Sequence, residues 1–406
     1  MHPSRLLSLS ALLLVACAAL RADSSDPWVG TWASSAQLAA PADAALVAAH
    51  GPLTIRQTIR VSTGGHRLRL QLSNHFGDAP LVVTGAAIAR STGADAINPS
   101  SSHPLAFSGK ADVTIAAGTD QFSDPFEFEL APLTEYTITL SVADVPHAVT
   151  AHPGSRQTSY VAAGTIGLDS PALLGATPVD HWYFISELDV VSPSPAFAIV
   201  TFGDSITDGR GTTTNGNNRW PDVLAGRLQA DPKLAAGGVL NEGIGGNRIM
   251  HPGLGESALD RMDRDVLAKH GVRWIILFEG INDIGSAKPG PNGELNLTAD
   301  DLIAAMGRIV SRAHAKGIRV MGGTITPFAG FAMYYTDQKE AIRQKVNAWI
   351  RSTKELDAVV DFDAAVRSPE QPTMIQPQYD VGDHLHLNPA GYGKLGATVD
   401  LTVFQR

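Results

Sequence analysis

The sequence predicts two domains: an all-β domain over residues 23–194 and an α/β domain over residues 195–406. Three observations indicate this division. Short runs that alternate apolar and polar residues fill the first part, and strand-like and helix-like runs alternate in the second. A Ser-Pro-Ser-Pro segment at 192–195 stands between them. A chain of 406 residues is also long enough for more than one domain.

The first domain is predicted to contain short strands separated by turn residues. Residues 53–61 and 66–72 flank a Ser-Thr-Gly-Gly segment, which is a hairpin signal. Leu68, Leu70 and Leu72 alternate with polar residues, so one face of that strand should be buried. Similar runs follow at 81–87, 111–115, 126–130, 136–142 and 182–188. Strands of this length and spacing predict a sandwich or jelly-roll-like architecture.

The second domain is predicted to be a parallel sheet with helical crossovers. The run 274–278 is apolar throughout, as expected for a central strand covered on both faces. A helix over 298–316 should open with Thr298 as its cap. The remaining expected strands are 196–202, 319–326 and 359–362, and the remaining helices are 220–228, 336–354 and one that starts at Asn388. Such sheets bind ligands at the carboxyl ends of their strands.

Composition excludes several classes of protein. Lys and Arg total 31 and Asp and Glu total 40, which gives a net charge of −9 and argues against a nucleic-acid binder. Charged residues make up only 17%, which argues against coiled coils and charged tails. The single cysteine is Cys17. A mature chain without it has no disulfide, no cysteine zinc site and no cysteine nucleophile.

The N-terminal residues 1–22 are predicted to be a signal peptide. Arg5 precedes an apolar run over 6–20 that is too short to span a bilayer comfortably. Two modes of processing fit: cleavage by signal peptidase near Cys17 or Ala22, or lipid attachment to Cys17, because 14–17 is similar to a lipobox. Both predict export to the periplasm or the outside, the second as a membrane-anchored lipoprotein. A buried N-terminal helix is the alternative.

Four short segments are expected where strands of the second domain end. They are Gly-Asp-Ser-Ile at 203–206, Asn-Glu-Gly-Ile-Gly-Gly-Asn at 241–247, Gly-Ile-Asn-Asp at 280–283, and Asp-His-Leu-His at 383–386. Each alone could be an ordinary turn. Together they supply the parts of an acyl-transfer site.

The chemistry assigns a role to each part. The Ser205 hydroxyl needs a base, which His386 would supply, and Asp383 would orient that imidazole. A tetrahedral oxyanion needs donors, for which the backbone N–H groups of Ser205 and Gly246 and the side chain of Asn282 are suited. One such donor is worth about 3–4 kcal/mol of the barrier.

Competing interpretations of these segments are weaker. The Gly-rich loop lacks the third glycine of a dinucleotide fingerprint. His384 and His386 would face opposite ways on an extended segment, and no third metal ligand stands out. Ser205 has no G-x-S-x-G context, and no S-x-x-K or P-loop pattern occurs. The sequence therefore predicts neither a cofactor nor a metal.

The four segments, in this order, resemble those of the SGNH hydrolases, also called GDSL esterases. The resemblance covers about 196–406. It implies a flavodoxin-like, three-layer α/β fold. It also implies that Ser205 is the nucleophile, that Gly246 (or Gly245) and Asn282 belong to the oxyanion hole, and that Asp383 and His386 complete the site.

Longer strings narrow the resemblance. The segments 203–212 and 218–221 look like those of the arylesterase/acylhydrolase subfamily found with xylan-degrading enzymes. Trp-Val-Gly-Thr-Trp-Ala at 28–33 is similar to the front domain of exported members. This resemblance implies a carbohydrate ester, with acetyl as the acyl group.

Residues expected near the site leave alternatives open. Aromatic residues after the strand 319–326 could stack on a sugar, hold an acyl chain or pack a loop on the core; they are Phe328, Phe331, Tyr334 and Tyr335. Arg219 and Arg248 could meet a polar or acidic substrate, although Arg219 could equally be an ordinary helix-start residue.

The functional prediction is a serine esterase for short-chain esters of plant polysaccharide such as xylan, acting on a small ester substrate. The alternatives are a lysophospholipase or thioesterase with the same machinery, or a carbohydrate-binding protein with an inert hydrolase domain.

Overall fold

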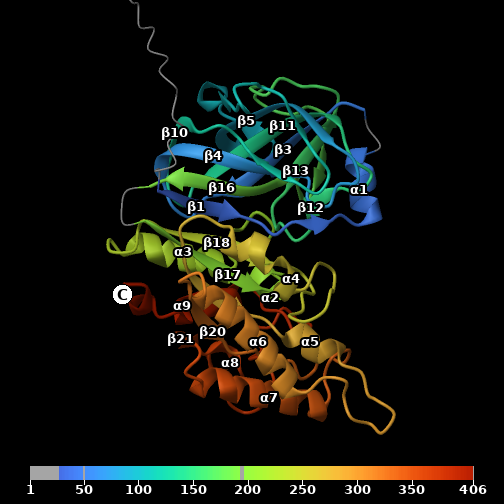
Figure 1. The fold of residues 1–406 in the computed structure, drawn as a ribbon, viewed down its shortest axis with the longest axis vertical. Coiled ribbons are helices and arrows are strands. Elements are labelled where there is room, and N and C mark those ends of the chain that lie inside the picture. Colours follow the sequence, from blue (N-terminus) through green and yellow to red (C-terminus); the bar gives the residue numbers. More distant parts are fainter. Residues whose placement is uncertain (1–26, 49–50, 193–195, 406) are drawn as a thin grey trace, which may run out of the picture.

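The computed structural model describes residues 27–48, 51–192 and 196–405 (Figure 1). The predicted signal peptide with Cys17, and the predicted boundary between 194 and 195, lie outside the described residues. Within the described part of the chain, no helix combines the length and apolar character needed to cross a membrane.

The C-terminal part is built on a five-stranded parallel sheet. Its strands are β17 (Phe197–Gly203), β18 (Gly237–Gly243), β19 (Val272–Phe278), β20 (Arg319–Gly323) and β21 (Ala358–Val360). Their order in the sheet is β18-β17-β19-β20-β21. The first strand along the chain thus lies between the second and the third, which is the order 2-1-3-4-5 of a doubly wound fold, whose ligands bind beside the point of reversal.

Helices cover this sheet. The strand β17 is buried along its whole length, as the apolar sequence of a strand covered on both faces requires. The two longest helices begin where predicted, each with a threonine cap: the side chain of Thr298 accepts from the Asp301 N–H, as predicted, and that of Thr336 accepts from the Lys339 N–H. The helical segments are α2 (Ser205–Asp208), α3 (Trp220–Ala230), α4 (Ala258–Met262), η2 (Asp263–Leu267), α5 (Ile281–Ser286), α6 (Ala299–His314), α7 (Asp337–Ser352), α8 (Phe362–Val366), α9 (Pro389–Thr398) and η3 (Leu401–Gln405).

The N-terminal part is rich in antiparallel strands, as predicted. One sheet contains β1 (Trp28–Ala33), β16 (Ile185–Val191), β4 (Gly65–Ser73) and β10 (Phe126–Leu130), with β9 (Asp120–Phe122) paired to β4. A larger sheet contains β14 (Thr177–Val179), β13 (Ser159–Ala163), β3 (Leu53–Arg60), β11 (Glu135–Asp144), β5 (Leu81–Gly93) and β6 (Ala96–Ile97), with β7 (His103–Pro104) and β8 (Val113–Ile115) paired to β5. A small sheet contains β15 (Trp182–Tyr183), β12 (Thr150–His152) and β2 (Gln37–Leu38), and the helical segments are α1 (Pro41–Ala48) and η1 (Pro99–Ser101). The jelly-roll connectivity stays a prediction.

The predicted hairpin at residues 62–65 is wrong. The strand β3 pairs with β11 and β13, whereas β4 pairs with β16, β10 and β9, so the turn carries the chain from one sheet to another. The Ser62 N–H and hydroxyl both donate to the Thr31 carbonyl, at 2.9 and 2.5 Å, which ties this turn to β1. The predicted strand 182–188 is likewise divided at Phe184, whose φ is +62°.

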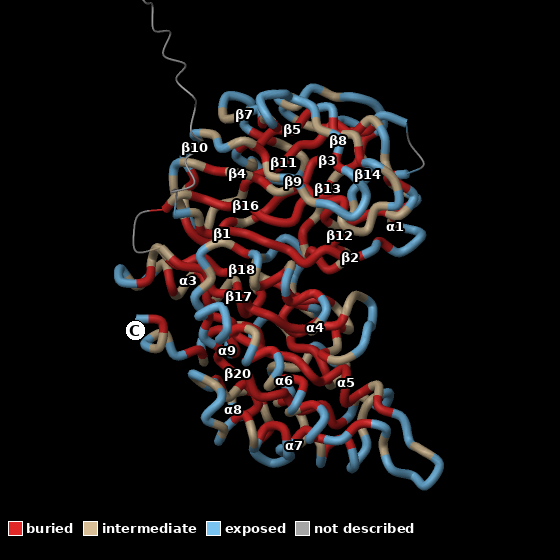
Figure 2. Tube along the Cα trace, in the orientation of Figure 1, coloured by how far each residue is buried: buried red, intermediate tan, exposed pale blue. Residues whose placement is uncertain are grey.

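The two parts meet along β1 and β18, which lie side by side (Figure 1). Ser34 forms a parallel bridge with Asn241, and the Gly30 N–H donates to the His270 carbonyl at 3.1 Å. Both strands are buried along almost their whole length, as Figure 2 shows. The N-terminal part, called the front part below, therefore packs against the edge of the parallel sheet, and it also contacts α2 and α4.

Candidate active site

The carboxyl ends of three neighbouring strands lie level with one another. In the parallel ladders Gly203 of β17 pairs with Gly243 of β18 and with Phe278 of β19. The segments that carry Ser205, Gly246 and Asn282 begin directly after these residues. Sequence reasoning did not identify β18, because its Gly-Gly-Val-Leu-Asn-Glu-Gly sequence is poor in strand-forming residues; the apolar pair Val239 and Leu240 was the available signal.

Ser205 is the first residue of α2, on the turn that follows β17. The Asp204 side chain caps this short helix by accepting the Ile206 N–H at 2.9 Å. Burial raises the pKa of Asp204 to about 7, against the effect of that hydrogen bond. Ser205 itself is buried, at 6% exposure.

Ser205, His386 and Asp383 lie in one chain of hydrogen bonds. The Ser205 Oγ is 2.9 Å from His386 Nε2, and His386 Nδ1 is 2.7 Å from Asp383 Oδ2. The other carboxylate oxygen of Asp383 accepts the N–H groups of Leu385 and His386, which fixes its orientation. With Nδ1 donating to a carboxylate, a neutral His386 presents the lone pair of Nε2 to the serine hydroxyl.

Electrostatics keep this imidazole neutral and this carboxyl ionised. Burial lowers the pKa of His386 below its ordinary value, although the Asp383 carboxylate acts in the opposite direction. Burial acts to raise the pKa of Asp383, but hydrogen bonds from the His386 backbone and ring outweigh it, so the pKa is lowered. Both shifts favour the protonation states that a serine–histidine pair requires.

Of the predicted oxyanion residues, Gly246 lies in the loop after β18 and Asn282 is the second residue of α5. Gly246 has a φ of +68°, a left-handed conformation that favours glycine, whereas Gly245 has no positive φ. The Asn282 Nδ2 donates to the Asn247 carbonyl at 2.9 Å, so the asparagine is tied to the Gly246 loop. The Tyr334 hydroxyl donates to Asn282 Oδ1 at 2.9 Å, which fixes the way the amide points.

Arg261 makes hydrogen bonds that hold the Gly246 loop in place, and it was not identified from the sequence. Its guanidinium is fully buried and donates to Asn247 Oδ1 at 3.0 Å, to the Gly203 carbonyl at 3.0 Å and to the Glu242 carbonyl at 2.8 Å. One side chain therefore joins the ends of β17 and β18 to the Gly246 loop. Nothing in its sequence context, an ordinary helical run, distinguishes it.

The predicted aromatic residues differ in their contacts. Phe328 is fully buried against Tyr335, at 5.6 Å between ring centroids, and so packs the loop onto the core. Tyr334 instead reaches Asn282, with the Phe331 ring edge-on to it at 5.0 Å.

The two arginines expected near the site have protein partners. Arg219 begins α3, pairs with Asp222 at 3.2 Å and lies over the Trp182 ring, as the helix-start alternative requires. Arg248 donates to Ser286 Oγ at 3.2 Å and also contacts the Pro252 carbonyl.

His384 lies outside the hydrogen-bonded chain of Ser205. Its Nδ1 pairs with Asp380 Oδ2 at 2.7 Å, so each histidine of this segment has its own carboxylate.

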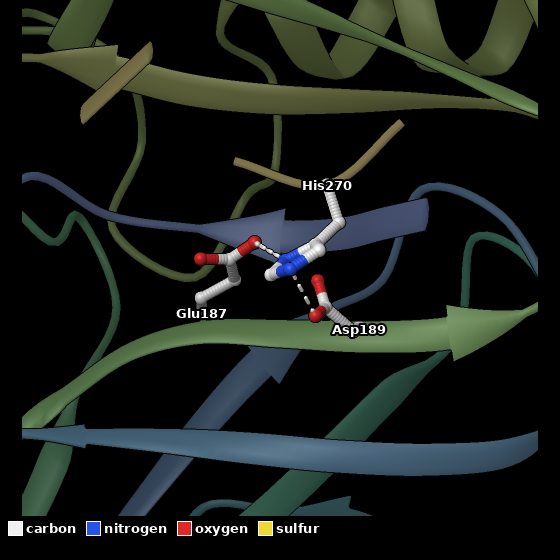
Figure 3. Close-up of side chains that lie close together, drawn as sticks. All are labelled: Glu187, Asp189 and His270. Atoms are coloured by element: carbon white, nitrogen blue, oxygen red, sulfur yellow. Dashed lines mark ion pairs between the residues drawn. The ribbon is translucent and has the colours of Figure 1, made fainter. Parts of the chain in front are cut away.

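A group of potential metal ligands lies where the two parts of the molecule meet (Figure 3). Ligand atoms of Glu187, Asp189 and His270 lie within 4.8 Å of one another. Both carboxylates already have cationic partners, however: Lys269 lies 3.3 Å from Glu187, and Arg69 lies 2.8 Å from Asp189. These cations disfavour a bound metal, and the group is best described as an ion-pair cluster. The carboxylates of Asp189 and Glu187, 3.0 and 3.6 Å from His270 Nδ1, raise the pKa of His270 to about 9.

Comparison with known proteins identifies the class of this site. Residues 201–394, just under half of the chain, match the model of the GDSL-like lipase/acylhydrolase family. No curated protein matches the chain. This part of the protein is thus similar to GDSL-like acylhydrolases. The protein is a carboxylic-ester hydrolase.

Solved structures resemble about half of the chain. A GDSL-like lipase from Bacteroides thetaiotaomicron is 19% identical over 51% of this chain and 87% of its own, with a TM-score of 0.38. A member of the lipolytic G-D-S-L family from Veillonella parvula is 19% identical over 52% of this chain and 100% of its own, with a TM-score of 0.36. An acetyl xylan esterase from Geobacillus stearothermophilus is 24% identical over 50% of this chain and 92% of its own, with a TM-score of 0.37.

Proposed function

We propose that the protein is a serine esterase in which Ser205 is the nucleophile, His386 is the general base and Asp383 orients the imidazole. The observation that carries this proposal is the pair of hydrogen bonds in series, 2.9 Å from Ser205 Oγ to His386 Nε2 and 2.7 Å from His386 Nδ1 to Asp383 Oδ2. Nucleophile, base and orienting carboxylate in hydrogen-bond contact are the arrangement that activates a serine hydroxyl.

The reaction follows from these positions. Ser205 Oγ attacks the ester carbonyl carbon while its proton passes to His386 Nε2. The developing oxyanion receives hydrogen bonds from the N–H groups of Ser205 and Gly246 and from Asn282 Nδ2. The bond to the alcohol then breaks, and His386 protonates the leaving oxygen. Water attacks the acyl-serine with His386 again as base, which releases the acid and restores Ser205.

The proposed substrates are short-chain esters, acetyl above all, of plant polysaccharide such as xylan. The support is the resemblance of the 203–212 and 218–221 segments to the xylan-associated subfamily. The Geobacillus stearothermophilus neighbour is an acetyl xylan esterase, which is a property of that protein. Tyr334, half-buried beside Asn282, offers an aromatic face on the same side of the sheet.

A second candidate is hydrolysis of longer acyl esters, as by a lysophospholipase or thioesterase. Two strongly exposed apolar side chains favour it: Leu254 at 76% and Met333 at 77% exposure. Leu254 carbons lie 3.1 Å from the position that a Cβ on Gly246 would occupy, and Met333 precedes Tyr334. Such residues could contact an acyl chain that extends past the oxyanion loop.

The test compares wild type with Ser205→Ala on 4-nitrophenyl esters of increasing chain length. We expect the substitution to lower kcat by about 10³-fold or more, because nucleophile and base act as a unit. Ser311→Ala, an exposed serine of α6, is the matched control and should match wild type. Equal rates for Ser205→Ala and wild type would refute the assignment of Ser205 as the nucleophile.

Chain length decides between the two candidates. A preference for acetate over octanoate supports the polysaccharide ester, and the reverse preference supports the longer acyl substrate. Acetate release from acetylated xylan, with Ser205→Ala as the blank, then tests the natural substrate class directly.

A further inference from the structure

The front part of the molecule reaches the rim of the candidate active site through the loop between β12 and β13. The Asn215 N–H donates to the Arg156 carbonyl at 2.9 Å, and the Thr158 N–H donates to Asn215 Oδ1 at 2.8 Å. The Gln157 side chain donates to Asn217 Oδ1 at 2.8 Å. This loop is therefore fastened to the segment that follows α2, the helix that begins with Ser205.

A second set of contacts holds the same loop against α2 itself. His152 Nε2 lies 3.0 Å from Oδ1 of Asp208, the last residue of α2, and His152 Nδ1 donates to the Ser35 carbonyl at 2.8 Å. The backbone of Gly154 lies so close to the Asp208 carboxylate that a Cβ at this position would collide with it. The loop thus contacts Asp208, which follows the candidate nucleophile Ser205 by three residues.

Arg156 is held in an unusual conformation on this loop. Its φ is +51°, in the left-handed region that non-glycine residues rarely adopt. Its side chain is half-buried, and its Nε is buried without a hydrogen-bond partner. Strain of this kind persists where the surrounding structure fixes it, and such positions gather at functional sites.

Arg210 reaches the same rim from the hydrolase part. Its N–H donates to the Ser205 carbonyl at 2.9 Å, and its carbonyl accepts the Tyr392 hydroxyl at 2.5 Å. The next residue, Gly211, lies so close to the Leu387 carbonyl that a Cβ there would collide with it. Arg210 therefore lies between the nucleophile segment and the segment of His386, with its own side chain exposed.

Both guanidinium groups act on the candidate base, and neither is neutralised. Burial is the largest effect that lowers the pKa of His386. The positive charges of Arg210 and Arg156 also lower this pKa, whereas the Asp383 carboxylate raises it. Among the described residues, no carboxylate lies within ion-pair distance of either guanidinium. Arg261 and Arg343, by contrast, are buried arginines saturated by carboxylates and carbonyls.

We propose that Arg156 and Arg210 form a subsite for a carboxylate on the alcohol part of the ester, such as a uronic acid residue beside the acylated sugar. Guanidinium groups bind carboxylates through paired, charge-assisted hydrogen bonds. This inference rests on the proposed function, which supplies the small acyl group and the sugar. It also gives the front part a role: it supplies Arg156, one of the two cations of the subsite.

The experiment compares acetate release from an acetylated oligosaccharide that contains a uronic acid with release from the same oligosaccharide after its carboxyl is converted to an amide. We expect wild type to favour the acidic form about tenfold in kcat/KM, the effect of one or two hydrogen bonds to a charged group. The preference should fall as salt is added, because part of it is Coulombic.

Arg156→Gln and Arg210→Gln should each lower the ratio of acidic to amidated kcat/KM toward one. The ratio cancels any change in the His386 pKa, because the same base serves both substrates. Arg156→Lys, which keeps the charge, should retain part of the preference. The matched control is Arg308→Gln, an exposed arginine of α6, which should keep the wild-type ratio.

Three outcomes overturn the inference: a wild-type ratio near one, a ratio unchanged in both glutamine variants, or an arginine dependence found for lysophospholipid and absent for the glycan. The Ser205→Ala variant tests the proposed function separately. If that variant still releases acetate, Ser205 is not the nucleophile, and this conclusion does not depend on the results for the arginine variants.

Discussion

The two parts of the molecule contribute to the candidate site in different ways. The hydrolase part supplies Ser205, His386 and Asp383 from the ends of its own elements, and their hydrogen bonds are made within that part. The front part supplies none of these three groups. It contributes buried polar contacts that support the hydrolase loops, such as Ser35 Oγ, which accepts from Arg261 at 2.9 Å, and His152, which pairs with Asp208.

The residues proposed to carry out the reaction thus belong to the hydrolase part, whereas the front part supports them through contacts. Changes within the hydrogen-bonded chain should affect the chemical step by orders of magnitude. Changes where the parts meet should act on stability or on substrate preference, and by much less. Four predictions test this separation.

The largest effect is expected at Asp383. Replacing it with Asn keeps the shape but removes the carboxylate that fixes the His386 tautomer, so kcat on 4-nitrophenyl acetate should fall by about 10⁴-fold. The matched control is Asp380→Asn, because Asp380 holds the neighbouring His384 in the same geometry. Equal losses in the two variants would show that the segment as a whole, and not the Asp383–His386 pair, matters.

The pH dependence should show a single acid limb. A charged imidazole accepts no proton from Ser205, and burial lowers the pKa of His386, so activity should persist below pH 6.5 and then fall about tenfold per pH unit. Rates of 4-nitrophenyl acetate hydrolysis between pH 4 and 8 measure this limb.

Asp204 provides the control for that profile. Its carboxyl adjoins Ser205 and has a pKa of about 7 because it is buried. Asp204→Asn keeps the cap on α2 but removes this titration. An acid limb that disappears in Asp204→Asn would assign the titration to Asp204 and contradict the role of His386.

Sequence reasoning succeeded where local chemistry determines structure. Helices begin at Thr298, Thr336 and Asn388 as predicted, because each side chain accepts a backbone N–H within its own turn. Ser205 and Asn282 follow predicted strands, and the structure places Ser205 and His386 in contact. Their catalytic roles remain proposals. The expectation that 383–386 lies at a strand end is wrong, because in the described chain this segment follows no strand and instead precedes α9.

Sequence reasoning failed where pairing depends on distant parts of the chain. A turn signal at 62–65 shows that the chain turns, but it does not show that β3 and β4 enter different sheets. Arg261 and Ser35 are in contact although 226 positions separate them, and no spacing rule relates them. Arg156 is placed by the docking of one part on the other. These contacts depend on tertiary packing and leave no periodic signal.

Tyr334 should give an intermediate effect, because it positions Asn282 and does not itself donate to the oxyanion. Tyr334→Phe removes the hydroxyl that donates to Asn282 Oδ1 and leaves the ring. We expect kcat to fall about tenfold with little change in KM, against about 10²-fold or more for Asn282→Ala. The control is Tyr335→Phe, whose hydroxyl contacts Asp337. A rise in KM with unchanged kcat would instead place Tyr334 in substrate binding.

The smallest effect is expected at His270, where the two parts meet. The folded pKa of His270 is about 9, raised above the ordinary 6.5 by the Asp189 and Glu187 carboxylates, with which it forms ion pairs (Figure 3). A raised pKa means that its stabilisation is fully present below pH 6.5 and is lost as the pH rises through about 9. His270→Gln should therefore lower Tm by about 2 °C at pH 6 and by nothing at pH 10.

Thermal unfolding of both proteins at pH 6, 8 and 10 measures this difference, with His251→Gln, an exposed histidine, as the control. Esterase activity per folded molecule should stay at the wild-type value, because the cluster supports the junction between the two parts and not the chemistry. A Tm difference that grows with pH would contradict the assignment of a raised pKa. A loss of activity without a loss of stability would show that the front part acts on the chemical step, and the separation between the two parts would then fail.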